Sequence, residues 1–179
     1  MKASILFTLI LLSSSLATAQ KFLTEKGTIS FFSDAAIEDI TAENTMVGSL
    51  FNATTGELVF IVKIKDFIFP KALMREHFNE KYMETEKFPK SLFTGKLKGY
   101  TLTDKGEQNV TATGKLTIHG VTRDVEVPGT IVFDSGKAMM KGKFMVALKD
   151  YDIKIPKLVW QNIAEEIEVK IDFVYKPMK

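Results

Sequence analysis

The fold is decided by the stretch Gly114-Lys115-Leu116-Thr117-Ile118-His119-Gly120-Val121-Thr122-Arg123, where two strand-like segments meet across a tight turn. Apolar and polar residues alternate before the turn, and the alternation resumes after it. A period of two is typical of a strand with one dry and one wet face, and Gly is common in tight hairpin turns. The stretch therefore predicts a β-hairpin formed by strands near 108–118 and 122–133.

The same alternation runs through most of the chain and is clearest near its end. There Ile167, Val169, Ile171, Phe173 and Tyr175 alternate with Glu166, Glu168, Lys170 and Asp172. Turn-forming Asn, Asp and Gly residues fall between such segments at 52–56, 104–106 and 134–136. Eight strands are predicted, near 26–33, 37–51, 57–66, 91–101, 108–118, 122–133, 138–149 and 165–176. Consecutive hairpins favour an all-β, antiparallel eight-stranded barrel, because closing the sheet removes both edges.

One long connection interrupts the strands, and its spacing is helical. Leu73 and His77 are four residues apart, and so are Met74, Phe78 and Tyr82 in turn. We expect one short helix at 71–82 that closes one end of the barrel. The preceding run 67–69 is too apolar to face water. A second irregular stretch, 151–162, holds Trp160 and is expected to cover the other end or a side.

The N-terminus has the pattern of a secretory signal peptide. Lys2 precedes the apolar run 5–12, and Ala17-Thr18-Ala19 forms an A-x-A cleavage site. We expect residues 1–19 to be a signal peptide and residues 20–179 to form one periplasmic domain. The apolar run is short for a membrane span, and the chain has no Cys that could carry a lipid anchor. A stable membrane anchor is therefore not expected.

Charge and motifs argue against several classes of function. The formal net charge is +2 and the lysines are scattered, which disfavours a nucleic-acid partner. His77 and His119 are the only histidines and lack the spacing of a metal site. No nucleophile elbow is present, and Ser91 has no neighbouring base. We expect no metal, no cofactor and no catalytic residues, so the protein is not expected to be an enzyme.

Several small residues share the predicted inward face with bulky ones. Gly48, Gly95, Gly99, Ala112, Gly114 and Gly142 fall on the face of Phe93, Leu97, Leu116, Met140 and Phe144. An eight-stranded barrel is either just filled by side chains or just wide enough for one small ligand. Missing side chains would favour a cavity, whereas glycines that serve bends and bulges would not. Both interpretations remain open on these residues alone.

Two stretches resemble the signature of the YceI-like family. One runs from Leu73-Met74-Arg75-Glu76-His77-Phe78 through Phe88-Pro89-Lys90-Ser91-Leu92-Phe93, and the other is the hairpin 114–123. The family consists of small secreted bacterial barrels, lipocalin-like in architecture. The chain departs from the family in lacking a His-Ser pair on its first strand.

The resemblance implies a ligand, namely a long apolar lipid such as a polyisoprenoid held in the barrel interior. We expect the chain to be a periplasmic carrier that binds it without a covalent bond. The expected lining consists of Phe60, Val62, Phe67, Phe69, Phe78, Phe93, Gly95, Leu97, Leu116, Gly142, Phe144, Ile171 and Phe173. The alternative is a filled barrel that acts through its surface, as an interaction or stress-response module without a lipid.

The precursor should be cut after Ala19, because the small-residue site follows the apolar run at the distance a signal peptidase needs. Mass spectrometry of the mature N-terminus should find Gln20, in part cyclised, in protein released to the periplasm. Recovery of intact Met1 from the envelope fraction would contradict this.

Overall fold

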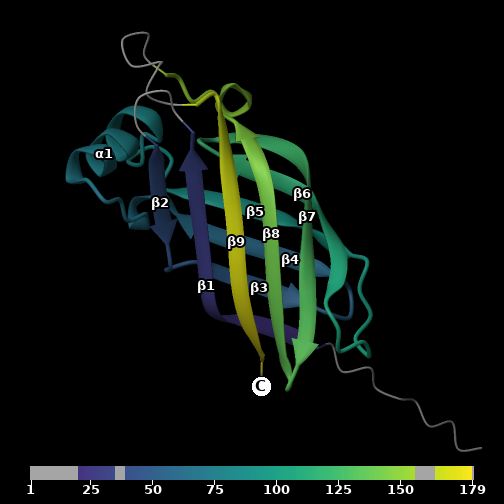
Figure 1. Cartoon of the computed structure of the whole chain (residues 1–179). Helices are drawn as coiled ribbons and strands as arrows, with labels where there is room; N and C mark the ends of the chain where they lie inside the picture. The colour runs from purple at the N-terminus through teal and green to yellow at the C-terminus, as the bar shows by residue number, and fades with distance from the viewer. Residues whose placement is uncertain (1–19, 35–38, 156–163, 179) are drawn as a thin grey trace, which may run out of the picture.

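The structure is a computed structural model that describes residues 20–34, 39–155 and 164–178 (Figure 1). The predicted signal peptide and Trp160 lie outside these residues. Within them are nine strands, all paired in antiparallel fashion. They are β1 (Lys21–Ser33), β2 (Ile40–Asn44), β3 (Gly48–Asn52), β4 (Glu57–Lys63), β5 (Lys90–Lys98), β6 (Gln108–Ile118), β7 (Val121–Asp134), β8 (Lys137–Ala147) and β9 (Glu166–Pro177).

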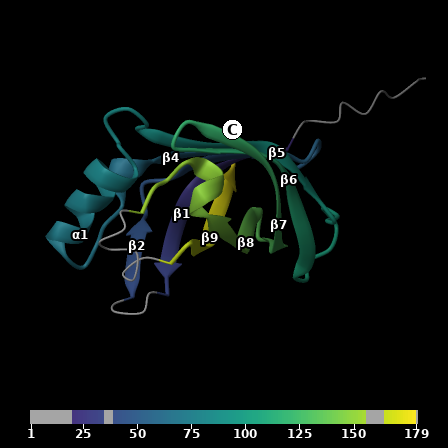
Figure 2. The same cartoon turned by 90° about the horizontal axis from the view of Figure 1, so that it is seen from above.

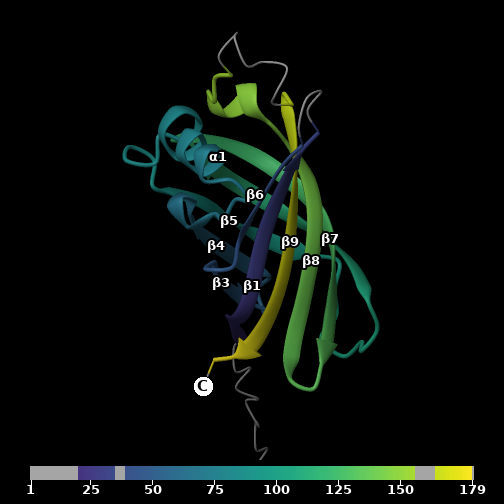
Figure 3. The same cartoon turned by 60° about the vertical axis from the view of Figure 1, so that its left-hand side comes forward.

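The sheet closes on itself through β1 and β9. From β3 to β9 each strand pairs with the next, and β9 returns to β1 in a ladder from Phe22↔Pro177 to Phe32↔Glu168 (Figure 3). The predicted strand 37–51 is divided into β2 and β3, which both pair with β1. Because β2 and β3 both pair with the same edge of β1, they share one strand position, and the barrel wall has eight such positions. The predicted all-β, eight-stranded antiparallel barrel is confirmed.

The break between β2 and β3 has a side-chain cause. Asn44 is fully buried, and its Nδ2 donates to the Lys63 carbonyl oxygen at 2.9 Å while its Oδ1 accepts from the Met46 amide at 2.9 Å. The amide side chain thus replaces the backbone bonds that a continuous strand would make to β4. Beyond the break, Glu43 pairs with Ile68 instead, through backbone bonds of 3.1 and 2.8 Å. The barrel wall therefore opens between β2 and β4.

The connection from β4 to β5 fills that opening with a 3-10 turn η1 (Ile64–Asp66), helix α1 (Ala72–His77) and a π-helical turn η2 (Phe78–Tyr82). The predicted helix at 71–82 is confirmed, although its second half is wider than an α-helix. Figure 2 shows α1 beside β2 at one end of the barrel. The pairing of Ile68 with Glu43 of β2 explains why α1 lies beside β2, because α1 begins only four residues after Ile68.

The opposite end of the barrel is closed by aromatic side chains. Phe22, Phe51 and Tyr175 are almost completely buried there, and Phe51 lies between the other two at ring distances of 6.1 and 6.2 Å. The Tyr175 hydroxyl is 2.8 Å from Ser49 Oγ, and burial raises the pKa of this phenol above its ordinary value. A buried hydroxyl needs such a partner, so this bond fixes the closed end.

The glycines of the predicted inward face have different roles. Gly95 and Gly114 are direct partners on β5 and β6, and a Cβ on either would overlap the backbone of the other strand. Because both residues lack a side chain, β5 and β6 can approach each other closely here, as glycines in strands often allow. Gly48 is exposed on the outer face, so the prediction that it faces inward is wrong. The strand break explains the error, because it shifts the alternation of the divided strand.

Gly114→Ala should lower the free energy of unfolding by about 1–3 kcal/mol, because the new methyl group overlaps the Thr94 carbonyl and Gly95. Gly48→Ala is the matched control, since a Cβ there meets nothing within 4 Å and should change stability by less than about 0.5 kcal/mol. Urea unfolding followed by circular dichroism measures both. Equal stability of the two variants would show that the strands do not approach closely at Gly114.

Candidate ligand-binding cavity

The end of the barrel that carries α1 (Figure 2) contains a cavity of about 410 Å³. Its wall combines inward-facing residues of seven strands with residues of the helical connection and of the 3-10 turn η3 (Leu148–Tyr151). Most of the lining is aliphatic or aromatic, and the polar side chains on it are Ser33, His77, Tyr82 and Ser91. Ligand cavities in proteins typically measure about 300–1,000 Å³ and are mainly apolar. The volume and the lining both suit an apolar ligand.

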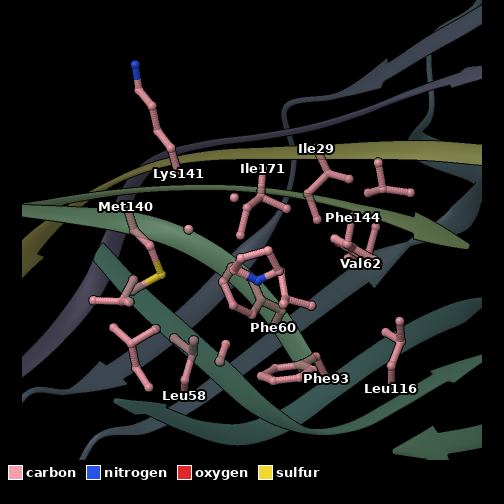
Figure 4. Close-up of a pocket in the computed structure, with 18 of the residues that line it drawn as sticks. Ile29, Leu58, Phe60, Val62, Phe93, Leu116, Met140, Lys141, Phe144 and Ile171 are labelled. Atoms are coloured by element: carbon pink, nitrogen blue, oxygen red, sulfur yellow. The ribbon is translucent and has the colours of Figure 1, made fainter. Parts of the chain in front are cut away.

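A second cavity of about 80 Å³ lies deeper in the barrel and adjoins the first. Both are lined by Ile29, Val62, Ser91, Leu116, Phe144 and Val169. Figure 4 shows this deeper pocket, with Met140, Ile171 and Phe60 around it and the Lys141 side chain directed away from them. The two cavities therefore form one apolar interior that narrows towards the aromatic end.

The structure brings together most of the residues expected to line the barrel interior. Phe60, Phe93, Leu97, Gly142 and Ile171 line the smaller cavity, Phe67, Phe69 and Phe78 line the larger one, and Val62, Leu116 and Phe144 line both. Two of the expected residues line neither. Gly95 lies against the β6 backbone, and Phe173 is fully buried with its ring 4.9 Å from that of Phe60.

Several residues that line the cavity are not among those predicted from the sequence. Met83, Leu148 and Ile153 belong to irregular segments, where no periodicity marks an inward face. Ile167 and Val169 could have been found, because they continue the alternation that places Ile171 inward. Their position at the cavity rather than in the filled part of the barrel depends on how far they lie along β9, which the alternation does not tell.

An aromatic cluster forms the wall between the barrel and the helical connection. The Phe31 ring of β1 lies 5.4 Å from Phe67 and 5.5 Å from Phe78, and Phe69 is 4.9 Å from Phe78. All four rings also line the larger cavity. The sequence predicts that Phe67, Phe69 and Phe78 line the interior. In the structure these rings face the cavity and also pack on one another.

His119 holds the segment after η2 against the barrel through hydrogen bonds. Its ring is 9 % exposed, with Nδ1 3.2 Å from the Tyr151 carbonyl oxygen and Nε2 3.1 Å from Glu84 Oε2. The Phe88 ring packs on it at 4.4 Å. His119 lies in the turn of the predicted hairpin, between β6 and β7, and its hydrogen-bond partners are remote in sequence. One imidazole joins the β6–β7 turn, the segment after η2 and η3.

Electrostatics at this contact favour a charged carboxylate. A hydrogen bond from Lys87, followed by one from His119, lowers the pKa of Glu84 below its ordinary value. Both Glu84 and His119 have a positive φ, of 41° and 50°. Left-handed backbone is rare for residues other than Gly, so the surrounding contacts must hold both residues in place.

No metal site or spanning helix is found in the part of the chain that the structure describes. Within residues 20–34, 39–155 and 164–178, no three His, Cys, Asp or Glu side chains gather closely enough to hold an ion. No helix of this part is long and apolar enough to cross a bilayer.

The sequence matches the model of the YceI-like domain over residues 12–175. The chain therefore belongs to the YceI-like family, as the two motif stretches predict. A comparison with curated proteins finds no match.

Solved structures share the fold. A polyisoprenoid-binding domain from Saccharophagus degradans is 12 % identical, with a TM-score of 0.75 over 90 % of this chain and 100 % of that one. BcnA from Burkholderia cenocepacia is 15 % identical, with a TM-score of 0.71 over 83 % and 95 % of the two chains. A YceI protein from Campylobacter jejuni is 18 % identical, with a TM-score of 0.62 over 80 % and 87 %.

His119→Asn should lower the free energy of unfolding by about 2 kcal/mol, because it removes one buried hydrogen bond, one partly buried hydrogen bond and a ring contact. Asn tolerates the left-handed backbone, so the loss reports the side chain. His77→Asn is the control, since His77 is half-buried and its side chain makes no hydrogen bond to any described residue, and it should cost less than about 1 kcal/mol. Urea unfolding distinguishes them, and similar losses would contradict this role of His119.

Proposed function

We propose that the protein is a periplasmic carrier that holds a long, polyisoprenoid-like lipid non-covalently in the barrel interior. The observation that carries the proposal is the apolar cavity of about 410 Å³, which continues into the deeper pocket of about 80 Å³. Membership of the YceI-like family supports it, and so does the fold shared with a polyisoprenoid-binding domain. Binding rather than catalysis fits a mainly apolar lining in which Ser91 makes no hydrogen bond to His77, the histidine that the described part of the larger cavity contains.

Exclusion of water from the hydrocarbon chain of the lipid would supply the binding affinity. Burial contributes at most about 0.8 kcal/mol per methylene, and large ligands realise about 0.3 kcal/mol per heavy atom. A lipid with about 30 buried heavy atoms would then reach roughly −9 kcal/mol, which corresponds to a sub-micromolar Kd. Because no ion pair is needed, the affinity should depend on chain length and hardly on ionic strength.

A second candidate function is docking to a partner through the outer surface, and one observation favours it. Leu23, Leu50, Ile61 and Leu92 are 39–46 % exposed on the outer face of neighbouring strands, with Leu23 opposite Leu50 and Ile61 opposite Leu92. Contiguous exposed apolar side chains often mark interaction sites. Such a function requires no lipid in the interior, so a test of cavity occupancy separates the two.

Val169→Phe should reduce the amount of lipid that co-purifies with the mature protein, because Val169 lines both cavities and the larger ring fills their junction. Val174→Phe is the matched control on the same strand, since Val174 points outward and lines neither cavity. Native mass spectrometry and organic extraction should find about one lipid per chain in the wild type and the control, and a clear loss in Val169→Phe.

Circular dichroism and thermal unfolding of each variant verify that the barrel is intact. If folded Val169→Phe keeps the full amount of lipid, the interior is not the binding site. If the wild type carries no lipid and takes none up, docking through the outer surface becomes the better explanation.

A further inference from the structure

One hydroxyl group interrupts the apolar junction of the two cavities. Of the residues that line both cavities in the described part of the chain, Ser91 alone is polar. It is 8 % exposed and lies on β5 opposite Val62, which has no polar side-chain atom to offer. Its Oγ has no hydrogen-bond partner among residues 20–34, 39–155 and 164–178. It is also not sealed by protein atoms, so it faces the open interior.

An unpartnered buried hydroxyl is costly. Leaving a buried donor or acceptor without a partner costs about 1–3 kcal/mol, and the great majority of buried polar groups have a partner. Ser33 and Ser49 illustrate this in the same barrel, because Ser33 Oγ accepts from the Ala164 amide at 2.9 Å and Ser49 Oγ contacts the Tyr175 hydroxyl at 2.8 Å. Ser91 differs in that its partner must come from the contents of the cavity.

We propose that Ser91 is a hydrogen-bonding subsite that selects a lipid carrying a neutral oxygen, either a hydroxyl or a carbonyl group. This inference rests on the proposed lipid-binding function and names the class of lipid. The oxygen is neutral because no ammonium or guanidinium group of the described residues faces the junction, and Lys141 is directed away from it (Figure 4). A buried charge without a counter-charge would be strongly unfavourable.

The two volumes indicate how the lipid lies. The deeper pocket of about 80 Å³ has room for only a small group, roughly the space of two or three water molecules, whereas the outer cavity of about 410 Å³ holds an apolar chain. Ser91 lies where they meet. The oxygen-bearing end of the lipid is therefore placed at the inner end of the larger cavity, and the hydrocarbon chain extends from it towards the helical connection.

The test measures two probes against the same variants of the mature protein after its own lipid has been extracted. The probes are geranylgeraniol and the hydrocarbon in which hydrogen replaces its hydroxyl group. Ser91→Ala should weaken geranylgeraniol binding about tenfold, which corresponds to about 1.4 kcal/mol, and leave the hydrocarbon within about twofold. This comparison isolates the contact between the two hydroxyl groups from the general attraction of the cavity for an apolar chain.

Two further variants serve as controls. Ser91→Thr keeps the hydroxyl and should restore the wild-type ratio of the two dissociation constants. Ser49→Ala removes a buried hydroxyl that lines neither cavity, so it should lower stability without changing the ratio. Without lipid, Ser91→Ala should unfold at the same temperature as the wild type or higher, because it loses no hydrogen bond to a described residue.

The outcomes separate the subsite from the proposed function. If both probes bind the wild type and Ser91→Ala leaves their ratio unchanged, the Ser91 subsite is wrong while lipid binding stands. If Ser91→Ala weakens both probes equally, its effect is on packing and the subsite is again wrong. If neither probe binds the wild type, both the subsite and the proposed function fail.

Discussion

The antiparallel pairing of β1 with β9 is the constraint on which the rest of the structure depends. It joins the first strand to the last over almost their whole length, from Phe22↔Pro177 to Phe32↔Glu168. β1 uses its other edge for β3 near its start and for β2 near its end. Among the described strands, closure leaves no long free edge and encloses the inward-facing side chains, so an apolar interior becomes possible without disulfides.

The shape of that interior follows from one local defect in the wall. Buried Asn44 ends β2 and separates it from β4, and the segment around Ile68 then pairs with β2 in place of β4. This widens one end and brings Phe67, Phe69 and Phe78 to its wall, while the other end stays filled by Phe51 and its neighbours. The larger cavity therefore lies at this end, although the inward faces of the described strands are apolar along their length.

Periodicity was a good guide wherever one strand continued without interruption. The alternation of β9 and of the β6–β7 hairpin placed Leu116, Ile171 and their neighbours inward, as observed. It failed for Gly48, because the break after Asn44 changes which residues face inward. It also gave no sign that Gly95 and Gly114 would lie opposite each other and bring two backbones together, since strand register is set by the turns and by pairing.

The sequence by itself determined the class of fold, the order of the hairpins, the short helix and the membership of the YceI-like family, because these depend on local alternation, turn residues and motifs. Only the tertiary structure decided which apolar residues enclose space and which fill it. It also decided that Ser91 meets the cavity without a partner, while His119 binds Glu84 and Tyr151. Alternation reports which face a residue occupies, whereas packing between remote segments settles what it meets there.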